Sequence, residues 1–517
     1  MTRTLILASL GRHRYLWRWG LVAGLALLPV LLYLPSLGAP LERDEGVYAT
    51  IAQGLQNGLI PYRDLFDNKP PLVYVWYSLS FVLLGENVAA PRIVAAVLLA
   101  LTTLLLLWEV RLLVSWRAAY LAAFIFALST GLARVGLHAN TEAYMLLPLV
   151  GSLVAFTLGI RRRRAYLFFV AGLLAGLAVM TKQVAVWNLL GLLIMACLWG
   201  LYQRRHWQRH LRRVGALVAG AVVSVTVVLL PFALARALDD FLEANLVFNM
   251  RWLGALSSLQ QLMNFLLGTG FFMAIAAPLV VASVLGLLLL WRRRRWPEDY
   301  LLAVWFVASA VGLLSARRFY PHYFMHLLPA VAILSGLALY HYFRPQVVAR
   351  HGLAVFVGLS LLLGLVSNLV VYLAPPEAAR TVSEAAFEDV RWERDSRALG
   401  QYLARNTSPR DTIYVYGRES QIYFYARRMP AARHIYDRSF WLEKGTLAET
   451  IEELRRTRPV YIVDSLQEPL YDYAQHHPPE WQRFIQENYE YVGRLYFADV
   501  YRLKGSRGPG SAQGFVV

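Results

Sequence analysis

Cysteine and lysine are both scarce in this chain of 517 residues. Its single cysteine, Cys197, lies in an apolar stretch, which excludes an internal disulfide framework and a cysteine-based metal site. Lysine occurs four times against 47 arginines, at Lys69, Lys182, Lys444 and Lys504. Because arginine is the ordinary basic residue here, each lysine at an unusual position needs a specific explanation.

Long apolar runs dominate the first three quarters of the chain. The sequence is 57% hydrophobic, and runs of about twenty apolar residues recur from residue 19 to 374, as in a polytopic membrane protein. Residues 376–517 differ, because they hold 20 of the 33 acidic and 20 of the 51 basic residues. The net charge of +18 therefore belongs to the membrane part, and it indicates basic cytoplasmic loops rather than nucleic-acid binding.

Clusters of arginine predict the topology. The strongest are Arg161–Arg164, residues 204–213 and Arg292–Arg295, which the positive-inside rule places in the cytoplasm. Eleven spans fit this rule, near residues 19–37, 91–112, 117–135, 143–160, 165–181, 184–202, 214–235, 264–290, 299–316, 322–342 and 352–374. The N-terminal run could pass for a signal peptide, but the many later spans favour an uncleaved first helix. We expect a plasma (inner) membrane protein with its N-terminus inside and its C-terminal region outside.

Two regions outside the spans have patterns of their own. Residues 72–84 form an apolar helix too short to cross, and its aromatic residues suit an interfacial helix in the first outer loop. The tail alternates helical and strand patterns, which predicts a small soluble α/β domain. The expected division is a transmembrane domain at 1–375, an extracytoplasmic domain at 376–504 and a disordered tail at 505–517.

An acidic pair, Asp44 and Glu45, follows the first expected span. Carboxylates at a membrane boundary are costly and are usually functional. Asp44 opens an expected helix that ends at Asn57, where a general base would be near water and held still. The alternative is that Asp44 only caps this helix, while Glu45 interacts with its positive end.

Two lysines are candidate phosphate ligands. Lys69 stands in Asn68-Lys69-Pro70-Pro71, where the prolines stop any helix and hold the lysine at the start of the interfacial helix. It can reach a lipid phosphate as a point charge, although snorkelling to the headgroups is the alternative. The choice of lysine over arginine favours the functional interpretation for Lys69. For Lys182, at the outer end of another span, both interpretations are equally good.

A third acid, Glu142, begins a span on the outer side. It could orient an acceptor or a cation, or it could only complement the dipole of a helix capped by Asn140 or Thr141. His138 lies four residues away, so a metal pair is geometrically allowed. One histidine and one glutamate are a weak signal, and we expect no metal there.

A later outer loop is rich in basic residues. Arg317 and Arg318 break the positive-inside rule, which suggests that they bind an anion. His322 and His326 have the spacing of zinc ligands, but no carboxylate accompanies them, so a core or interfacial role is favoured. Arg251 is a further candidate cation, for which an amphipathic interfacial segment is the preferred alternative.

Several short motifs follow one another in a moderately specific order over the first 375 residues. They are Asp44-Glu45, Tyr48-Ala49, the helical segment to Gly58, Lys69-Pro70 before an aromatic helix, and Gly85 followed by Ala90-Pro91-Arg92. This order resembles the membrane glycosyltransferases of the GT-C fold, closest to the family of the lipid A aminoarabinose transferase and the protein O-mannosyltransferases. Glu142 falls at the second acid of that family, and residues 317–329 resemble its later outer loop. Asn68 replaces an acid of the aminoarabinose branch, and Glu142 stands where aspartate is frequent, so the acceptor stays open.

The resemblance implies an inverting glycosyltransferase that moves a monosaccharide from a polyprenyl-phosphate carrier to a lipid, glycan or protein acceptor on the extracytoplasmic side. Asp44 would be the base, and Glu45 and Glu142 would orient the base and acceptor. The donor phosphate would be bound by Lys69, Lys182, Arg251, Arg317, Arg318, His322 and Tyr323, with Tyr48 and Asn68 also in the site. No cofactor is implied, no nucleotide-binding loop is visible, and a need for a divalent metal stays open.

Two other functions are compatible with parts of the sequence. A lipid or solute transporter or flippase would place charged residues at mid-span, whereas the charges here gather at one interface. In a non-enzymatic membrane scaffold, Asp44 and Lys69 could be substituted without loss of function.

Overall fold

The structure of the chain is a computed structural model. It describes residues 2–132, 137–202, 207–342, 390–466 and 477–506, and positions 358, 359, 362 and 366. The expected span near 352–374, apart from those four positions, and nearly all of the expected tail at 505–517 lie outside the described residues.

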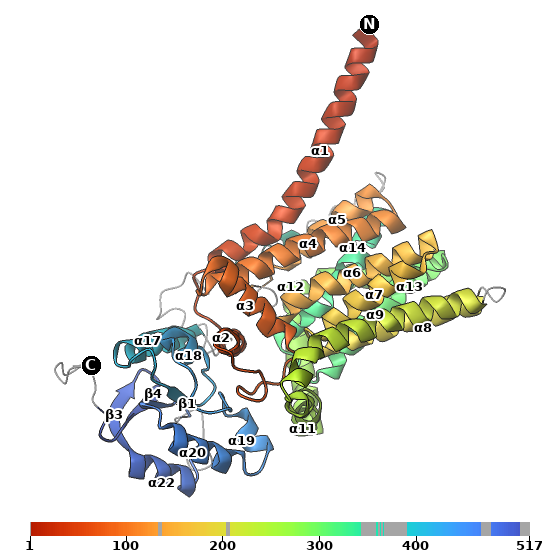
Figure 1. Ribbon diagram of the computed structural model, residues 1–517. Helices are drawn as coiled ribbons and strands as arrows, with labels where there is room; N and C mark the ends of the chain where they lie inside the picture. Colours follow the sequence, from red (N-terminus) through yellow and green to blue (C-terminus); the bar gives the residue numbers. More distant parts are fainter. Residues whose placement is uncertain are drawn as a thin grey trace. The chain divides into compact units, whose positions relative to one another are not determined.

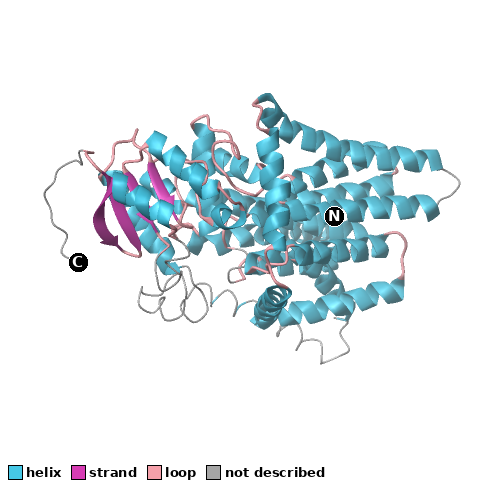
Figure 2. Ribbon diagram, turned by 90° about the horizontal axis from the view of Figure 1, so that it is seen from below, coloured by secondary structure: helices cyan, strands magenta, loops and turns pink. Residues whose placement is uncertain are grey.

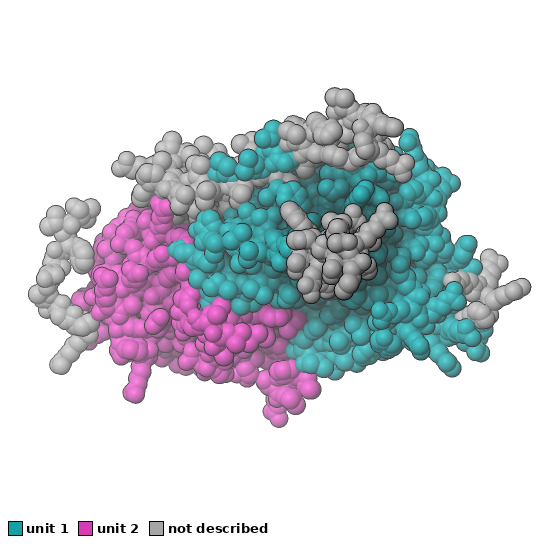
Figure 3. Space-filling model, turned by 90° about the horizontal axis from the view of Figure 1, so that it is seen from above, with its two compact units in different colours: residues 1–38, 89–228, 256–372 teal, residues 39–88, 229–255, 373–517 magenta. Residues whose placement is uncertain are grey.

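The chain forms two compact units, which Figure 3 colours separately. Unit 1 comprises residues 1–38, 89–228 and 256–372. Unit 2 comprises residues 39–88, 229–255 and 373–517. The loop after the first helix (residues 39–88, the first loop) therefore belongs to the same unit as the C-terminal α/β region, although more than 300 residues separate them in the sequence.

Unit 1 is helical (Figure 1). Its main helices are α1 (Thr2–Tyr33), α4 (Ala89–Leu113), α5 (Trp116–Ser129), α6 (Thr141–Arg162), α7 (Ala165–Val179), α8 (Val186–Tyr202), α9 (Trp207–Leu234, which runs on into unit 2), α12 (Ser258–Arg293), α13 (Glu298–Ser315) and α14 (Leu328–Tyr342). Within the described ranges, seven helices are long and apolar enough to cross a membrane, and four shorter helices are also apolar. Each expected span from 19–37 to 322–342 coincides with one of these helices, which confirms the polytopic helical membrane class.

Helices α7 and α9 approach each other through glycine. A Cβ atom built on Gly172 would lie 1.9 Å from the carbonyl oxygen of Leu217. A Cβ atom on Gly220 would lie 2.0 Å from that of Phe169. Small residues of this kind let two helix backbones come together where the surroundings offer little hydrophobic driving force.

The helical part of unit 2 includes the first loop. It contains α2 (Arg43–Gln56), α3 (Leu72–Leu84), α10 (Leu238–Leu242), the π-helical turn η4 (Glu243–Val247) and α11 (Phe248–Gly254). Helix α3 has the bounds that the sequence predicts, but Tyr74 and Tyr77 face inward and are fully buried against Tyr48. Its exposed face consists of aliphatic residues such as Val82 instead.

A four-stranded sheet organises the C-terminal part of unit 2, and Figure 2 shows its strands in magenta. The strands are β1 (Ile413–Tyr416), β2 (Tyr461–Asp464), β3 (Tyr489–Leu495) and β4 (Ala498–Leu503), in the order β1-β2-β4-β3. Strands β1 and β2 are parallel, and β4 is antiparallel to β2 and β3. The helices are α17 (Val390–Arg405), α18 (Gln421–Ala426), α19 (Arg438–Leu442), α20 (Thr446–Thr457) and α22 (Pro479–Asn488).

Helices cover both faces of this sheet, with α17 and α18 on one face and α20 and α22 on the other (Figure 1). Every residue of β1 and β2 is buried, as expected for strands with two covered faces. On the α20–α22 face, the ring of Trp481 stacks on that of Tyr416 with centroids 3.9 Å apart. The α/β domain predicted from the alternating pattern is therefore present.

Candidate functional site

Helix α2 carries the acidic pair of the first loop. It begins with a capping box, in which the Glu45 carboxylate accepts a hydrogen bond from the N–H of Glu42 at 3.1 Å. The cap thus lies two residues before Asp44, so the interpretation of Asp44 as the capping residue is wrong. Glu45 is buried in this role, whereas Asp44 is half-buried in the first turn, where the helix dipole favours an anion.

The segment around Lys69 is held at its backbone and at its side chain. The hydroxyl of Tyr62 donates to the Lys69 carbonyl at 2.7 Å, and that of Tyr74 reaches it at 3.2 Å. The Lys69 ammonium donates to Oδ1 of Asn68 at 3.1 Å. Asn68 in turn exchanges two hydrogen bonds of 2.9 Å with Asn249 from α11. Lys69 is therefore a half-buried cation with a defined orientation.

Asp67 is an acid at this site that the sequence interpretation missed. It is 2% exposed and accepts hydrogen bonds from the hydroxyls of Tyr74 at 2.7 Å and Tyr436 at 2.9 Å. Burial and the charge of Asp67 raise the pKa of both tyrosines well above the usual value, so both hydroxyls keep their protons and donate.

In unit 1, Glu142 and Lys182 form a buried ion pair. Glu142 lies in the first turn of α6 and is fully buried, and Lys182, just before the short helix η2 (Gln183–Ala185), is 5% exposed. Thr141 donates its hydroxyl to the second Glu142 oxygen at 2.9 Å, and the Lys182 ammonium lies 4.1 Å from the ring centroid of Tyr323. Snorkelling therefore does not describe Lys182, because its charge is compensated inside the protein.

A small cavity adjoins this ion pair. Its volume is about 10 Å³, about the minimum that holds one water molecule. The lining residues are Glu142, Lys182, Val184, Gly312, Leu313, Ala316, Tyr323 and His326. The cavity thus combines a carboxylate, an ammonium, a phenol and an imidazole, which can together hold a water or a hydroxyl group.

The hydrogen bonds of His326 define which of its ring nitrogens is an acceptor. Nδ2 of Asn188 donates to the Ser309 hydroxyl at 2.9 Å, so Oδ1 of Asn188 faces Nε2 of His326 at 2.7 Å. An amide oxygen only accepts, so Nε2 carries the hydrogen. A second positive charge beside the buried ammonium of Lys182 is unfavourable, which leaves Nδ1 with a lone pair. Nδ1 is buried without a hydrogen-bond partner in the described part of the chain, so it can accept from a group in the cavity.

The loop after α13 contains the other cationic candidates of unit 1. Arg317 is exposed and Arg318 is half-buried. His322 and Tyr323 are half-buried in the 3-10 helix η5 (Pro321–His326), so the α-helical spacing assumed for a histidine pair does not apply. The core role favoured for His326 is confirmed by its burial and its bond to Asn188.

Arg251 of unit 2 is paired with an acid of the C-terminal region. Its guanidinium donates to Glu443 at 2.7 Å, and the arginine side chain is half exposed. This contact gives Arg251 a structural partner, and its assignment to the donor phosphate stays a prediction.

The predicted site residues fall into two groups. Asp44, Glu45, Tyr48, Asn68, Lys69 and Arg251 lie in unit 2, and Glu142, Lys182, Arg317, Arg318, His322 and Tyr323 lie in unit 1. The structure brings Asn68 together with Lys69, and Glu142 together with Lys182 and Tyr323. The single site expected for both groups stays a prediction. Among the described residues, no three His, Cys, Asp or Glu side chains are placed to hold a metal ion.

Comparisons with known proteins found one family match over part of the chain and several similar structures. Residues 68–230 match the family model described as dolichyl-phosphate-mannose-protein mannosyltransferase. The structure resembles ArnT from Cupriavidus metallidurans bound to undecaprenyl phosphate, with a TM-score of 0.62, 16% identity and coverage of 95% of this chain and 99% of that one. It also resembles the archaeal oligosaccharyltransferase AglB from Archaeoglobus fulgidus in complex with an inhibitory peptide and a dolichol-phosphate. For AglB the TM-score is 0.52 and the sequence identity is 15%, and the match covers 95% of this chain and 75% of AglB.

No curated protein sequence matches the chain. The family match covers residues 68–230, and the structural matches show that the chain shares the GT-C fold of ArnT and AglB. The prediction from the first-loop motifs is confirmed, and the transporter alternative is not favoured.

Proposed function

We propose that the chain catalyses inverting transfer of a monosaccharide from a polyprenyl-phosphate carrier to an acceptor at the extracytoplasmic face of the cell membrane. The observation that carries this proposal is the family match, because residues 68–230 include Lys69, Glu142 and Lys182. Both structural neighbours were solved with a lipid phosphate, undecaprenyl phosphate in one and dolichol-phosphate in the other, which supports a donor of this class.

The leaving group of such a donor is a lipid phosphate. Its developing negative charge is stabilised best by cations that are in place before the reaction. Lys69 in unit 2 and Lys182 in unit 1 are the candidates, since Asn68 orients the first and Glu142 and Tyr323 hold the second. Arg317, Arg318 and His322 are further candidates in unit 1.

The acceptor must lose a proton as it attacks the anomeric carbon. Asp44 is the proposed base, because it is half-buried and the hydrogen bonds of the helix cap are made by its neighbours Glu42 and Glu45. Attack from the face opposite the phosphate inverts the anomeric configuration. Glu45 supports Asp44 by holding the start of α2, and Glu142 supports Lys182.

The experiment that tests the proposal uses the purified protein in lipid bilayers. It is incubated with a panel of polyprenyl-phosphate sugars and candidate acceptors, and release of the free carrier phosphate is followed. We expect release with at least one donor and the opposite anomeric configuration in the product. No release from any donor, with a folded protein, would overturn the proposal.

A further inference from the structure

We infer that the C-terminal α/β domain (residues 390–466 and 477–506) holds the candidate site of the first loop in its geometry. Tyr436 and Glu419 of this domain are the positioning residues. Tyr436 holds the segment that carries Lys69, and Glu419 holds the helix that carries Asp44. The effect on sugar transfer rests on the proposed function, whereas the effect on the geometry of the loop does not.

The Lys69 segment is attached to the domain by buried hydrogen bonds. The Tyr436 hydroxyl donates to Asp67, whose other oxygen accepts from Tyr74 of α3. Two hydrogen bonds therefore hold Asp67, two residues before Lys69, between the domain and α3. Because Asp67 is buried, loss of either tyrosine hydroxyl leaves an oxygen without its donor and favours movement of the segment.

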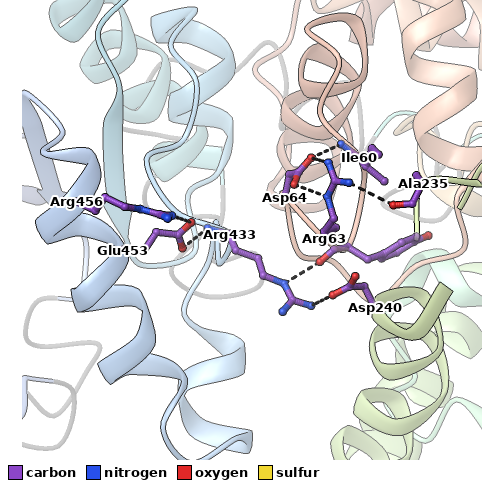
Figure 4. Close-up of polar contacts among 9 residues, drawn as sticks. Ile60, Arg63, Asp64, Ala235, Asp240, Arg433, Glu453 and Arg456 are labelled. Atoms are coloured by element: carbon purple, nitrogen blue, oxygen red, sulfur yellow. Dashed lines mark hydrogen bonds and ion pairs between the residues drawn. The ribbon is translucent and has the colours of Figure 1, made fainter. Parts of the chain in front are cut away.

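Arg433 makes a second attachment, and Figure 4 shows its contacts with Asp240 and Glu453. Its Nε donates to the carbonyl of Tyr62 at 2.8 Å, and its carbonyl accepts from the N–H of Phe66 at 2.8 Å. Its guanidinium also pairs with Asp240 at 3.2 Å, and its own N–H donates to Glu453 at 3.0 Å. These bonds bracket the turn at residues 62–66, directly before Asp67 and Lys69.

Helix α2 is attached to the domain at the carboxyl end of β1. Arg43 donates to Glu419 at 3.1 Å, and Ser465 donates to the other oxygen of Glu419. The helix backbone also comes close, because a Cβ atom on Gly46 would lie 2.6 Å from the backbone nitrogen of Gln421. Arg43 and Gly46 flank Asp44 and Glu45, so the orientation of the acidic pair follows that of the domain.

Tyr436 binds Asp67 directly, and Asp67 lies two residues before Lys69. A change at Tyr436 should therefore alter the position of the segment that carries Lys69, although Tyr436 itself belongs to the C-terminal domain.

The first test measures hydrogen–deuterium exchange of the full-length protein in lipid nanodiscs, with Tyr436→Phe as the variant. Tyr489→Phe is the matched control, because Tyr489 is also buried and donates a hydrogen bond of 3.1 Å, but to Pro459 within the domain. We expect faster exchange at residues 60–72 in Tyr436→Phe alone. Equal exchange at these residues in both variants and the parent protein would overturn the inference.

The second test measures sugar transfer by the same variants. We expect the donor KM of Tyr436→Phe to rise about tenfold while Tyr489→Phe stays within about twofold of the parent, as for loss of one hydrogen bond to a charged group. Glu419→Gln should lower kcat by about tenfold, with Glu490→Gln, which loses a surface pair with Arg502, as its control. Equal losses in each variant and its control would show that only domain stability matters, and would overturn the inference.

The two tests separate this inference from the proposed function. If the parent protein transfers no sugar, the proposed function fails, and the exchange data alone decide whether the domain holds the loop. If the parent is active and Tyr436→Phe shows parental exchange and parental KM, the proposed function stands and the inference fails.

Discussion

Asp44 is the proposed base, and its neighbours Glu45 and Asp67 have structural roles. Glu45 closes the capping box and Asp67 receives two tyrosine hydroxyls, so both carboxylates serve the structure. Asp44 is half-buried in the first turn of α2. We therefore expect Asp44→Asn to lower kcat by about 10² to 10⁴, the usual contribution of a general base. The measurement is carrier-phosphate release by the purified variant.

The control for Asp44→Asn is Asp64→Asn. Asp64 lies in the same loop and is also half-buried, but it is paired with Arg63 at 2.8 Å and accepts from the N–H of Ile60. Its replacement should leave kcat within about threefold of the parent, as expected for a partly exposed ion pair. Full activity of Asp44→Asn would remove Asp44 as the base.

The ion pair of Glu142 and Lys182 allows its structural and catalytic roles to be separated. Removing one partner of a buried pair leaves an uncompensated charge, which costs about 3 to 5 kcal/mol of stability. We expect Glu142→Gln to lower the thermal unfolding midpoint and to abolish transfer. The measurements are unfolding of the protein in detergent and carrier-phosphate release in lipid.

The double variant Glu142→Gln, Lys182→Met separates the structural role of the ion pair from its role in transfer. Replacing a whole buried pair by uncharged groups is often neutral, so stability should return. Transfer should stay lost if the Lys182 ammonium serves the donor phosphate. A double variant that recovers both stability and transfer would show that the pair is only structural.

At the scale of elements, local patterns predict bounds well. Helix α3 occupies residues 72–84, as the sequence predicts, because two prolines mark where it begins. The alternation of helical and strand patterns in the tail likewise predicts the α/β character of the C-terminal domain. These features are specified by neighbours in the chain.

Long-range pairing is what the sequence does not reveal. Tyr436 and Asp67 are 369 residues apart, and nothing in the local pattern of either predicts their bond. The same holds for Arg43 with Glu419 and for Glu142 with Lys182, which lie on separate elements. The candidate residues themselves were largely recognisable from residue type and motif order, but their partners required the fold.

His434 makes the stability of the C-terminal domain dependent on pH. Burial and the neighbouring Arg433 lower its pKa to about 3, and its Nδ1 lies 2.8 Å from the Ser439 hydroxyl. The unfolded chain binds a proton near pH 6.5 and the folded chain does not, so stability falls as the pH drops from about 6.5 towards 3. At pH 5 the expected loss is about 2 kcal/mol relative to pH 8.

The measurement is the unfolding midpoint of the full-length protein between pH 8 and pH 5, compared with His434→Asn. The variant keeps a polar group near Ser439 but cannot titrate. It should be less stable at pH 8 and show a shallower decline below pH 6.5. Parallel declines in the two proteins would assign the pH dependence to other groups.

At the scale of the whole molecule, the chain segments that make up unit 2 limit the possible membrane topologies. The first loop and the C-terminal domain share buried hydrogen bonds, such as those of Asp67 with Tyr436 and Thr50 with the Ser420 carbonyl. Two segments bonded in this way must lie on the same side of a membrane. The arginine clusters of unit 1 independently predict that this side is the outer one.

Cysteine labelling tests this topology, since the chain has a single native cysteine to remove. In a Cys197→Ser background, Gln56→Cys and Glu487→Cys should react with a membrane-impermeant maleimide in intact cells. Arg162→Cys and Arg292→Cys should react only after permeabilisation, because each lies in an exposed arginine cluster predicted to be cytoplasmic. Each substitution leaves three neighbouring arginines in place, so the charge bias that orients the helices persists. Labelling of Glu487→Cys and Arg292→Cys from the same side would contradict the predicted orientation, and with it the extracytoplasmic placement of Asp44 and Lys69.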